Sequence, residues 1–478
     1  MTDHVTVMTA PAAVKGYEAT RQRHIAAMLG RVGAHLERLA WPAERLREER
    51  ATRLRALLAR AKQRSSWHRE RLADIDLTTV NEDVLPALPV MTKEDLMEHF
   101  DAIVTDPRVT LEQVNAHIQA LDADRYFLND LHAVASGGSS GVRAAFVWGW
   151  DAWAEVQLAL LRRQISDRLA DPELAASPPV SMIVAADRAA HFTSALAQTF
   201  ATNAIQVHRF PVTLPVEAIV AGLNEVRGDG LATYPSMLAT LVAEARAGRL
   251  TIAPRRILTM AEPLLPEIRA AAQATWDAPV ANLWGTSEAG ITAMGCFREA
   301  GMHLSDDQVI VELVDVDGRP VPPGVRSDKV YVTNLINPLL PLIRYEISDE
   351  VTVIDEPCGC GSAFTRVADI QGRNDDVFVY ANRIAVHPHT FRSRLAQEAT
   401  VSEYQVHQTL NGADLLLRAA GAVDLNRLAR DLESALAKLG CEHPTVTVRR
   451  VDALPRLATG KLKRFLPSDT AQLLAARL

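Results

Sequence analysis

Two apolar runs, PVSMIVAA at residues 179–186 and RILTM at residues 256–260, bracket the stretch of sequence that decides the fold. Their length and apolar character are typical of buried strands. Between them, residues 216–226 and 235–248 carry apolar side chains at helical spacing. Short apolar runs that alternate with helices predict strand–helix–strand units, which extend from about residue 130 to 290.

The rest of the chain predicts three further regions. Residues 15–75 are predicted to be helical, because apolar side chains recur at helical spacing among many arginines. This basic amphipathic stretch could face a membrane or a partner helix, or could pack on the main body with a solvated outer face. Close strands separated by Gly and Pro turns predict an antiparallel β region, with strands at 309–314, 329–333 and 350–354. A βαβαβ-like unit follows, with strands at 377–380, 415–419 and 445–450 and helices at 390–398 and 425–439.

The predicted fold class is therefore α/β in a mixed α+β chain. We expect a large N-terminal domain at residues 1–371, made of strand–helix layers and a β region. Within it, a helical extension occupies 1–75, an α/β core about 90–300, and the β region about 305–371. A small α+β domain is expected at residues 372–478.

Composition excludes several classes of protein. The 478 residues include 48% hydrophobic residues and carry a net charge of −7, which argues against nucleic acid as the main partner. Neither a secretory signal at 1–15 nor a long apolar membrane span is recognisable. Four cysteines are too few for a disulfide scaffold. We expect a cytoplasmic protein without a membrane partner.

Three short segments carry groups suited to a nucleotide. The loop SGGSSG at 136–141 combines glycines and hydroxyls that could approach phosphate oxygens, although a flexible turn is the better explanation of this loop taken alone. The segment WGTSE at 284–288 offers an aromatic face, hydroxyls and a carboxylate suited to Mg²⁺. Near the C-terminus, Lys461 follows a glycine in a basic loop and could carry its charge to a developing negative centre. Each segment alone also fits a turn or a solvated charge.

Together, the order and spacing of these segments resemble the adenylate-forming superfamily, and most closely its phenylacetate–CoA ligase-like branch. The resemblance runs from about residue 90 to the C-terminus. It is carried by six elements: SGGSSG (136–141), MAEP (260–263), WGTSE (284–288), RYEISD (344–349), GRNDD (372–376) and PRLATGK (455–461).

This resemblance implies a role for each site residue. Residues Ser136, Gly138, Ser139, Ser140 and Gly141 would hold the phosphates of ATP, and Glu288 would hold magnesium. Residues Ala261, Glu262, Pro263 and Trp284 would flank adenine, Asp349 would bind ribose, and Gly285, Thr286, Ser287 and Arg373 would complete the nucleotide site. Lys461 would contact the attacking carboxylate and the α-phosphate. Asp375 would be the hinge about which a mobile C-terminal domain rotates between two half-reactions.

The chain departs from the family pattern at two places. A Gly-Gly pair at 137–138 replaces the usual Ser-Gly, and Arg143 stands where proline is common. Glu346-Ile347-Ser348 replaces Arg-Thr-Gly, so a phosphate contact from that arginine is absent. These changes put the rate of adenylation and the second half-reaction in doubt.

The cysteines and one histidine predict a metal centre. Cys296-x6-His303 and Cys358-x-Cys360 supply the ligand set of a closed tetrahedral zinc site, although Cys-x-Cys is tighter than the common spacing. Some relatives of the resembled branch carry the same two patterns, which implies structural zinc here. Cys441 is left over as an ordinary buried thiol.

The resemblance implies ATP-dependent activation of a carboxylic acid, with release of pyrophosphate and then transfer to coenzyme A. An aromatic acid would pack on Phe146, Trp148 and Tyr234, although core packing explains these residues equally well. One alternative passes the acyl group to an amine, a hydroxyl or a carrier-protein thiol. A second alternative is a non-catalytic binding protein with the same fold. A homodimer is compatible with these features.

Overall fold

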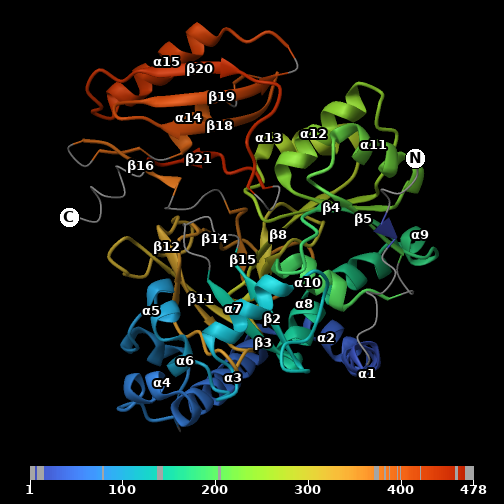
Figure 1. Ribbon diagram of the computed structural model, residues 1–478, viewed down its shortest axis with the longest axis vertical. Coiled ribbons are helices and arrows are strands. Elements are labelled where there is room, and N and C mark those ends of the chain that lie inside the picture. The colour runs from blue at the N-terminus through green and yellow to red at the C-terminus, as the bar shows by residue number, and fades with distance from the viewer. Residues whose placement is uncertain are drawn as a thin grey trace.

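The computed structural model describes residues 6–7, 16–77, 80–136, 144–202, 206–370, 376–381, 384–386, 388–395, 397–398, 400–419, 421–457 and 461–468. Figure 1 shows a large lower part and a smaller part, coloured orange to red, above it. The predicted boundary between residues 371 and 372 lies outside the described residues and stays a prediction. In the described ranges, no helix has both the length and the apolar character needed to cross a membrane.

The centre of the large part is a mixed sheet. Its strands lie in the order β1 (Thr6–Val7), β5 (Gln206–Pro211), β4 (Val180–Ala185), β6 (Gly230–Thr233), β7 (Arg256–Met260), β8 (Val280–Thr286), β9 (Gly290–Met294), β10 (Met302–Leu304), β15 (Arg366–Val367) and β14 (Val353–Ile354). Strands β5, β4, β6, β7 and β8 are parallel, and the others pair antiparallel. The carboxyl ends of the parallel strands therefore meet at one edge.

Helices lie on both faces of this sheet (Figure 1). On one face are α11 (Val216–Val226), α12 (Pro235–Arg246) and α13 (Pro266–Trp276); on the other are α8 (Trp150–Leu169) and α10 (Phe192–Thr199), with α9 (Pro172–Ala175) beside α8. Helices α12 and α13 each begin with a proline, whose fixed φ and missing N–H suit the first turn of a helix. The predicted strand–helix layers are thus confirmed.

Two smaller sheets complete the large part. Strands β2 (Leu131–Ala135) and β3 (Ala145–Gly149) form an antiparallel pair, and β11 (Val309–Val314), β12 (Lys329–Asn334) and β13 (Tyr345–Ile347) form an antiparallel sheet. The strand predicted at 350–354 is only Val353–Ile354, and it joins the edge of the large sheet instead. It pairs there with β15, a partner 13 residues further along the chain that spacing did not indicate.

The small part has its own hydrophobic core between Phe378 and Phe465. It contains β16 (Phe378–Val379), β17 (Ala385–Val386), α14 (His389–Leu395), β18 (Val401–Gln408), β19 (Ala413–Ala419), α15 (Leu425–Lys438), β20 (Val446–Arg450) and β21 (Phe465–Leu466). The predicted βαβαβ-like order is wrong in detail. Strand β18 was missed, and it pairs antiparallel with β19, whereas the strand near 378 belongs to a separate two-stranded pair.

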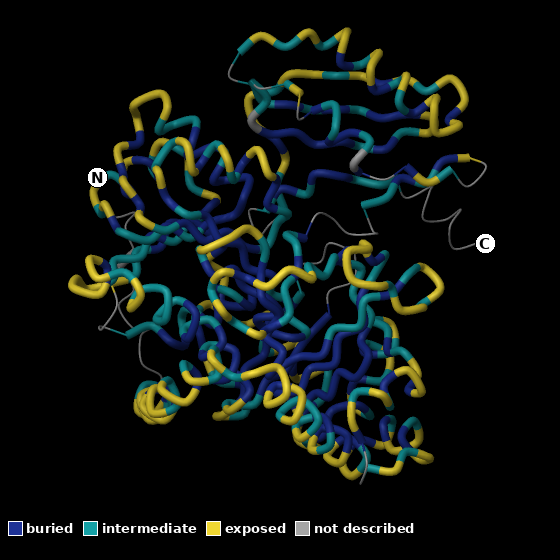
Figure 2. Tube along the Cα trace, turned by 180° about the vertical axis from the view of Figure 1, so that it is seen from behind, coloured by how far each residue is buried: buried dark blue, intermediate teal, exposed yellow. Residues whose placement is uncertain are grey.

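The N-terminal helices pack on the large part, and Figure 2 shows their outer surfaces as exposed. They are α1 (Tyr17–Leu29), α2 (Val32–Arg38), α3 (Ala43–Arg64) and α4 (Ser66–Arg71), followed by the 3₁₀ helix η1 (Glu82–Ala87), α5 (Lys93–Glu98), α6 (Phe100–Ile103) and α7 (Leu111–Ala120). Leucines of α3 are buried in a shared core with Ile310 and Ile343. Packing on the main body thus accounts for the amphipathic pattern.

Buried ion pairs tie these helices to the body. The carboxylate of Asp307 is fully buried and accepts two hydrogen bonds from Arg162 at 2.7 and 2.8 Å, and a third from Arg38 of α2 at 3.0 Å. Glu155 of α8 accepts hydrogen bonds from Arg38 and from Arg53 of α3. Burial alone would raise the pKa of Asp307, but the charge and hydrogen bonds of Arg162 hold that pKa well below its usual range.

We predict that Asp307→Asn lowers the free energy of unfolding at pH 7 by about 3–5 kcal/mol, because it leaves buried arginines without their counter-charge. The native pKa of Asp307 is depressed, so its stabilisation is present above the unfolded pKa of about 4 and is lost as pH falls towards the native pKa. The gap between wild type and variant in urea unfolding should therefore narrow below about pH 4. Asp317→Asn is the control, because the Asp317–Arg319 pair is exposed and should contribute less than about 1 kcal/mol. Equal effects of the two substitutions would contradict the prediction.

Candidate active site and metal centre

The loops that leave β6, β7 and β8 form the candidate site at the carboxyl edge of the sheet. Tyr234 follows β6, the Ala261–Pro263 turn follows β7, and Ser287 and Glu288 follow β8. Ala261 has a φ of 68°, a left-handed conformation that is rare for a residue with a Cβ. Such strain persists only where the surroundings hold it, and it is common at functional sites.

Glu262 holds this turn in place and joins three segments. Its carboxylate accepts the backbone N–H of Ser236 at 3.0 Å and the Ser236 hydroxyl at 3.1 Å, at the first turn of α12. It also accepts the backbone N–H of Leu462 at 2.8 Å, from the small part of the chain. The carboxylate predicted to lie beside adenine is therefore engaged by α12 and by the lysine loop.

The lysine loop thereby docks on the carboxyl edge of the sheet. The Nζ atom of Lys461 lies 5.9 Å from the centre of the Tyr234 ring, within cation–π range. The Tyr234 hydroxyl accepts the backbone N–H of Ala186 at 3.0 Å, and burial raises the pKa of Tyr234 to about 12. Tyr234 therefore stays neutral at pH 7 and offers Lys461 an aromatic face.

Arg456 makes a second contact between the two parts of the chain. It donates to the Ser236 hydroxyl at 3.1 Å, and it also donates to Glu403 of β18. Sequence reasoning missed both Ser236 and Arg456. The available signals were Pro235-Ser236 at a helix start and Pro455-Arg456 at the head of the lysine loop.

Trp284 and Asp349 are brought together from two distant motifs. The indole N–H donates to the Asp349 carboxylate at 2.8 Å, and both side chains are buried. Thr286 lies two residues further on and caps the turn by accepting the Ala289 N–H at 3.0 Å. The predicted aromatic and acidic partners of a nucleoside are thus in direct contact.

Glu288 follows β8 and is half-buried. Its backbone carbonyl accepts a hydrogen bond from Asn334 at 2.9 Å. Burial raises the pKa of Tyr345, and the negative charge of Glu288 raises it further, which places Glu288 near this tyrosine. A carboxylate supplies the oxygen ligands that a hard cation such as Mg²⁺ prefers.

Part of the predicted nucleotide site lies outside the described residues. This applies to Gly138, Ser139, Ser140 and Gly141, and to Arg373 and Asp375. Ser136 is described, and it closes the base of the loop: its N–H donates to the Ala144 carbonyl at 2.8 Å, and its hydroxyl accepts the Ala144 N–H at 3.0 Å. The β2–β3 pair thus extends to the base of this loop.

The three aromatic residues predicted to bind the acid lie in different environments. Phe146 and Trp148 of β3 are completely buried in the main core, and Trp148 packs against Trp153 and Phe192. Tyr234 is also buried, but it lies beside Lys461. Of the three, Tyr234 is the one that lies beside Lys461.

The four predicted metal ligands converge. The Sγ atoms of Cys296, Cys358 and Cys360 and a ring nitrogen of His303 all lie within 4.8 Å of one another. The Cys296 and Cys358 sulfurs are 3.6 Å apart, and Cys360 Sγ is 3.4 Å from His303 Nε2. A tetrahedral zinc ion with bonds of about 2.3 Å to sulfur and 2.0 Å to nitrogen needs edges of roughly 3.5–3.8 Å.

The opposite ring nitrogen of His303 supports this arrangement. His303 Nδ1 lies 3.3 Å from the Phe364 carbonyl oxygen, a partner that leaves Nε2 free of its proton to bind metal. The sulfurs are too far apart for a disulfide, which requires about 2.05 Å. Donor chemistry, spacing and orientation all fit a closed metal site.

We predict that Arg456→Ala loosens the docking of the small part, because it removes the hydrogen bond to Ser236. In small-angle scattering, the variant should have a larger radius of gyration than the wild type. Arg450→Ala is a matched control, since Arg450 donates hydrogen bonds to the carbonyls of Ala419 and Gly421 within the small part. An unchanged radius in the Arg456 variant would show that this contact does not hold the two parts together.

Comparison with known proteins supports the predicted resemblance. No family model matches the chain. A phenylacetate-coenzyme A ligase of Thermus thermophilus is 25% identical over 394 residues, which cover 78% of this chain and 81% of that protein.

Solved structures share the fold. A 2-hydroxyisobutyryl-CoA ligase in the postadenylation state superposes with a TM-score of 0.70 at 18% identity, over 92% of this chain and 93% of that chain. The same ligase in its thioesterification state reaches a TM-score of 0.56. The arrangement of the two parts seen here is thus closer to the former. The chain has the fold of the adenylate-forming ligases, and its similarity to their phenylacetate–CoA ligase-like branch is confirmed.

Proposed function

We propose that this protein is an AMP-forming acid ligase that uses ATP to activate a carboxylic acid and then transfers the acyl group to coenzyme A. A carboxylate oxygen bonds to the α-phosphorus of ATP, and the bond from that phosphorus to pyrophosphate breaks. The thiolate of coenzyme A then bonds to the acyl carbon and AMP leaves, while the thiol proton passes to solvent. The docking of the Lys461 loop on Glu262 carries this proposal, because it brings a cation to the carboxyl edge of the sheet.

Each of the described site residues has a separate role in the first step. Lys461 neutralises negative charge as the carboxylate approaches the α-phosphate, an interaction that is strongest in the transition state. Trp284 and Asp349 bind the nucleoside, the former through its ring and the latter through ribose hydroxyls. Glu288 would hold Mg²⁺, which neutralises charge on the phosphates when it is bound. Tyr234 and Ala186 border the place where the acid meets Lys461.

The second step requires the lysine loop to leave. Two of the contacts that dock it are hydrogen bonds from Leu462 and Arg456, each with a charged partner and worth roughly 1.5–3 kcal/mol net. Rotation of the small part about the predicted hinge at Asp375 would expose the acyl-adenylate to the thiol. A docking held by a few polar contacts suits a reaction with two arrangements.

We predict that Lys461→Ala lowers acid-dependent pyrophosphate release by at least about 10²-fold, because a transition-state charge contact is lost. Binding of ATP, measured by calorimetry, should change little. Lys438→Ala, at the last turn of α15, is the matched control and should keep full activity. Comparable rates in the wild type and the Lys461 variant would remove the basis of the proposal. Omitting coenzyme A, or replacing it with an amine or an alcohol, identifies the acceptor.

We also propose that Cys296, His303, Cys358 and Cys360 bind a structural zinc ion. The four donors complete a tetrahedron, so no position is left for a substrate. Bound metal would fasten the segment after β9 to the segment before β15.

Cys358→Ser should reduce zinc to well below one ion per chain in elemental analysis and should lower the melting temperature, because a ligand is lost. Cys441→Ser is the control: Cys441 is a buried cysteine outside the cluster, and its replacement should leave the zinc content unchanged. Wild-type protein purified without chelators that contains no zinc would refute the assignment.

A further inference from the structure

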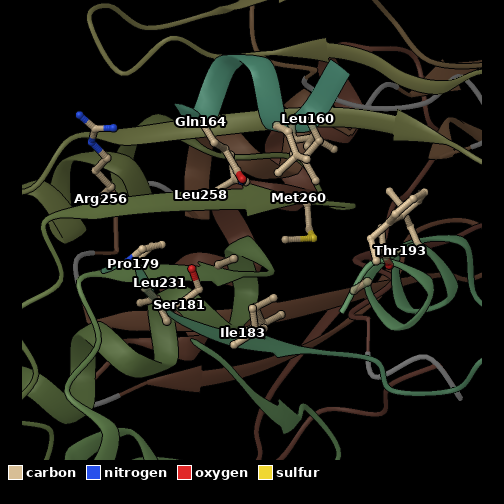
Figure 3. Close-up of a pocket in the computed structure, with 18 of the residues that line it drawn as sticks. Leu160, Gln164, Pro179, Ser181, Ile183, Thr193, Leu231, Arg256, Leu258 and Met260 are labelled. Carbon is tan, nitrogen blue, oxygen red and sulfur yellow. The ribbon is translucent and has the colours of Figure 1, made fainter. Parts of the chain in front are cut away.

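A cavity of about 540 Å³ lies between the large sheet and helices α8 and α10. Figure 3 shows Leu160 and Gln164 of α8 over the strand that carries Leu258 and Met260, with Ile183 on β4, two strands away, and Thr193 of α10 at one end. Most of its lining is apolar. Small-molecule sites are commonly roughly 300–1,000 Å³ and largely apolar, so the cavity has the size and character of a binding site.

The sheet face that lines the cavity is covered only in part. On β4, Ser181 and Ile183 point into the cavity and are half-buried, whereas Met182 and Val184 between them are completely buried on the other face. Ala232 of β6 is also half-buried and lines the cavity. Alternate residues of a strand face opposite sides, so one face is packed against helices and the other meets open space.

Helix α8 shows the matching pattern. Its residues Gln157, Leu160, Leu161, Gln164, Ile165 and Arg168 recur at helical spacing and line the cavity. Each of them is half-buried, whereas Val156, Leu158 and Ala159 of the same helix are buried in the core. The helix therefore stands away from the sheet along one stripe, and leucines that would ordinarily pack on strands face a void.

One end of the cavity lies at the carboxyl ends of the strands that lead into the candidate site. Its lining includes Met260 and Leu283, which immediately precede the Ala261–Pro263 turn and Trp284. It also includes Ala185, next to the Ala186 N–H that donates to Tyr234. This end of the cavity is therefore directed towards the loops of the candidate site.

The other end lies at the amino ends of the same strands. Arg256 stands there, at the end opposite Met260 in Figure 3. The four residue steps of β7 between them span about 13 Å at roughly 3.3 Å per step. Charged groups at this end are paired: Arg168 bonds to Asp229 at 2.7 Å, and Arg256 donates to the Asp167 carbonyl.

We propose that this cavity holds the acyl group of the substrate, and that the substrate is a long, flexible, hydrophobic carboxylic acid. The inference rests on the proposed function and narrows its substrate class. The carboxylate lies at Lys461, and the aliphatic chain extends along the strands between β4, β6 and β7 and the stripe of α8. A compact aryl acid would fill only the mouth and leave most of the apolar surface in contact with water, whereas a flexible chain adapts to the full length.

Chain length is the test of this proposal. Pyrophosphate release is measured with benzoate, phenylacetate, butyrate, octanoate, dodecanoate and hexadecanoate. The ratio kcat/KM should rise roughly three- to fourfold per added methylene until the cavity is filled, since each buried methylene lowers the free energy of binding. Dodecanoate should exceed phenylacetate by at least about 100-fold on this scale. A preference for benzoate or phenylacetate with no dependence on chain length overturns the proposal.

Two substitutions at different depths of the cavity test how far the acyl chain extends into it. Ala232→Phe obstructs the middle of the cavity and should shorten the longest acid accepted, so that the ratio of kcat/KM for butyrate to kcat/KM for dodecanoate rises at least tenfold. Ser181→Phe obstructs the far end and should exclude only the longest acids. Ala247→Phe, at an exposed position after α12, is the control and should not alter the length profile. Two cavity variants that are folded, as judged by circular dichroism, and that keep the wild-type length profile would overturn the proposal.

Measuring acid binding in the absence of ATP distinguishes the proposed function from the cavity assignment. Calorimetry should detect dodecanoate binding to the wild type, and at least tenfold weaker binding to Ala232→Phe. If dodecanoate binds but no acid of the panel supports pyrophosphate release, the proposed function fails and the cavity assignment stands. If short acids are activated but dodecanoate neither binds nor reacts, the proposed function stands and the cavity assignment fails.

Discussion

The parallel direction of β4, β6, β7 and β8 is the constraint on which the rest of this molecule depends. Because parallel strands end at the same edge of the sheet, the loops that follow them all lie along that edge. Tyr234 and Glu262 are far apart in sequence and become neighbours for this reason. The strained turn at Ala261 is the local consequence, since the chain must reverse there within reach of α12.

Glu262 makes this edge of the sheet a docking point for the lysine loop. A carboxylate can accept several hydrogen bonds, and this one takes two from the start of α12 and one from the loop after Lys461. The first two are internal to the large part and keep the carboxylate oriented when the loop departs. The third is made to a backbone N–H, so it depends on the path of the loop and not on its side chains. Such a contact positions Lys461 without competing for its charge.

The sequence predicts the parts of this structure that depend on local pattern. Strands β7 and β11 and helix α11 have the expected bounds, and four metal ligands from two separate segments were named from spacing and resemblance. Strand β18 was missed because five of the eight residues in its sequence VSEYQVHQ are polar and the alternation is interrupted by adjacent polar pairs. Its polar residues have long-range partners, such as Arg456 and Arg418 for Glu403, and such partners are invisible in a local window.

The cavity beside α8 could not be predicted for a related reason. The family resemblance placed Phe146 and Trp148 in the acid pocket, yet both are buried in the core. The leucines of α8 are the opposite case, because their spacing in the sequence is that of ordinary core residues. Only the separation of α8 from the sheet leaves them half-buried, and that separation is set by how the whole layer packs.

The metal centre and the cavity meet at one residue. Phe297 follows the ligand Cys296, has a φ of 57° despite its bulky side chain, and lines the far end of the cavity with Arg256 packed over its ring at 5.5 Å. A left-handed conformation at a phenylalanine is unfavourable and needs support from its surroundings. A metal bound by Cys296, His303, Cys358 and Cys360 would supply that support, because it would fix the backbone at the preceding residue. The metal would then act on specificity without touching substrate, by holding the wall against which the end of an acyl chain packs.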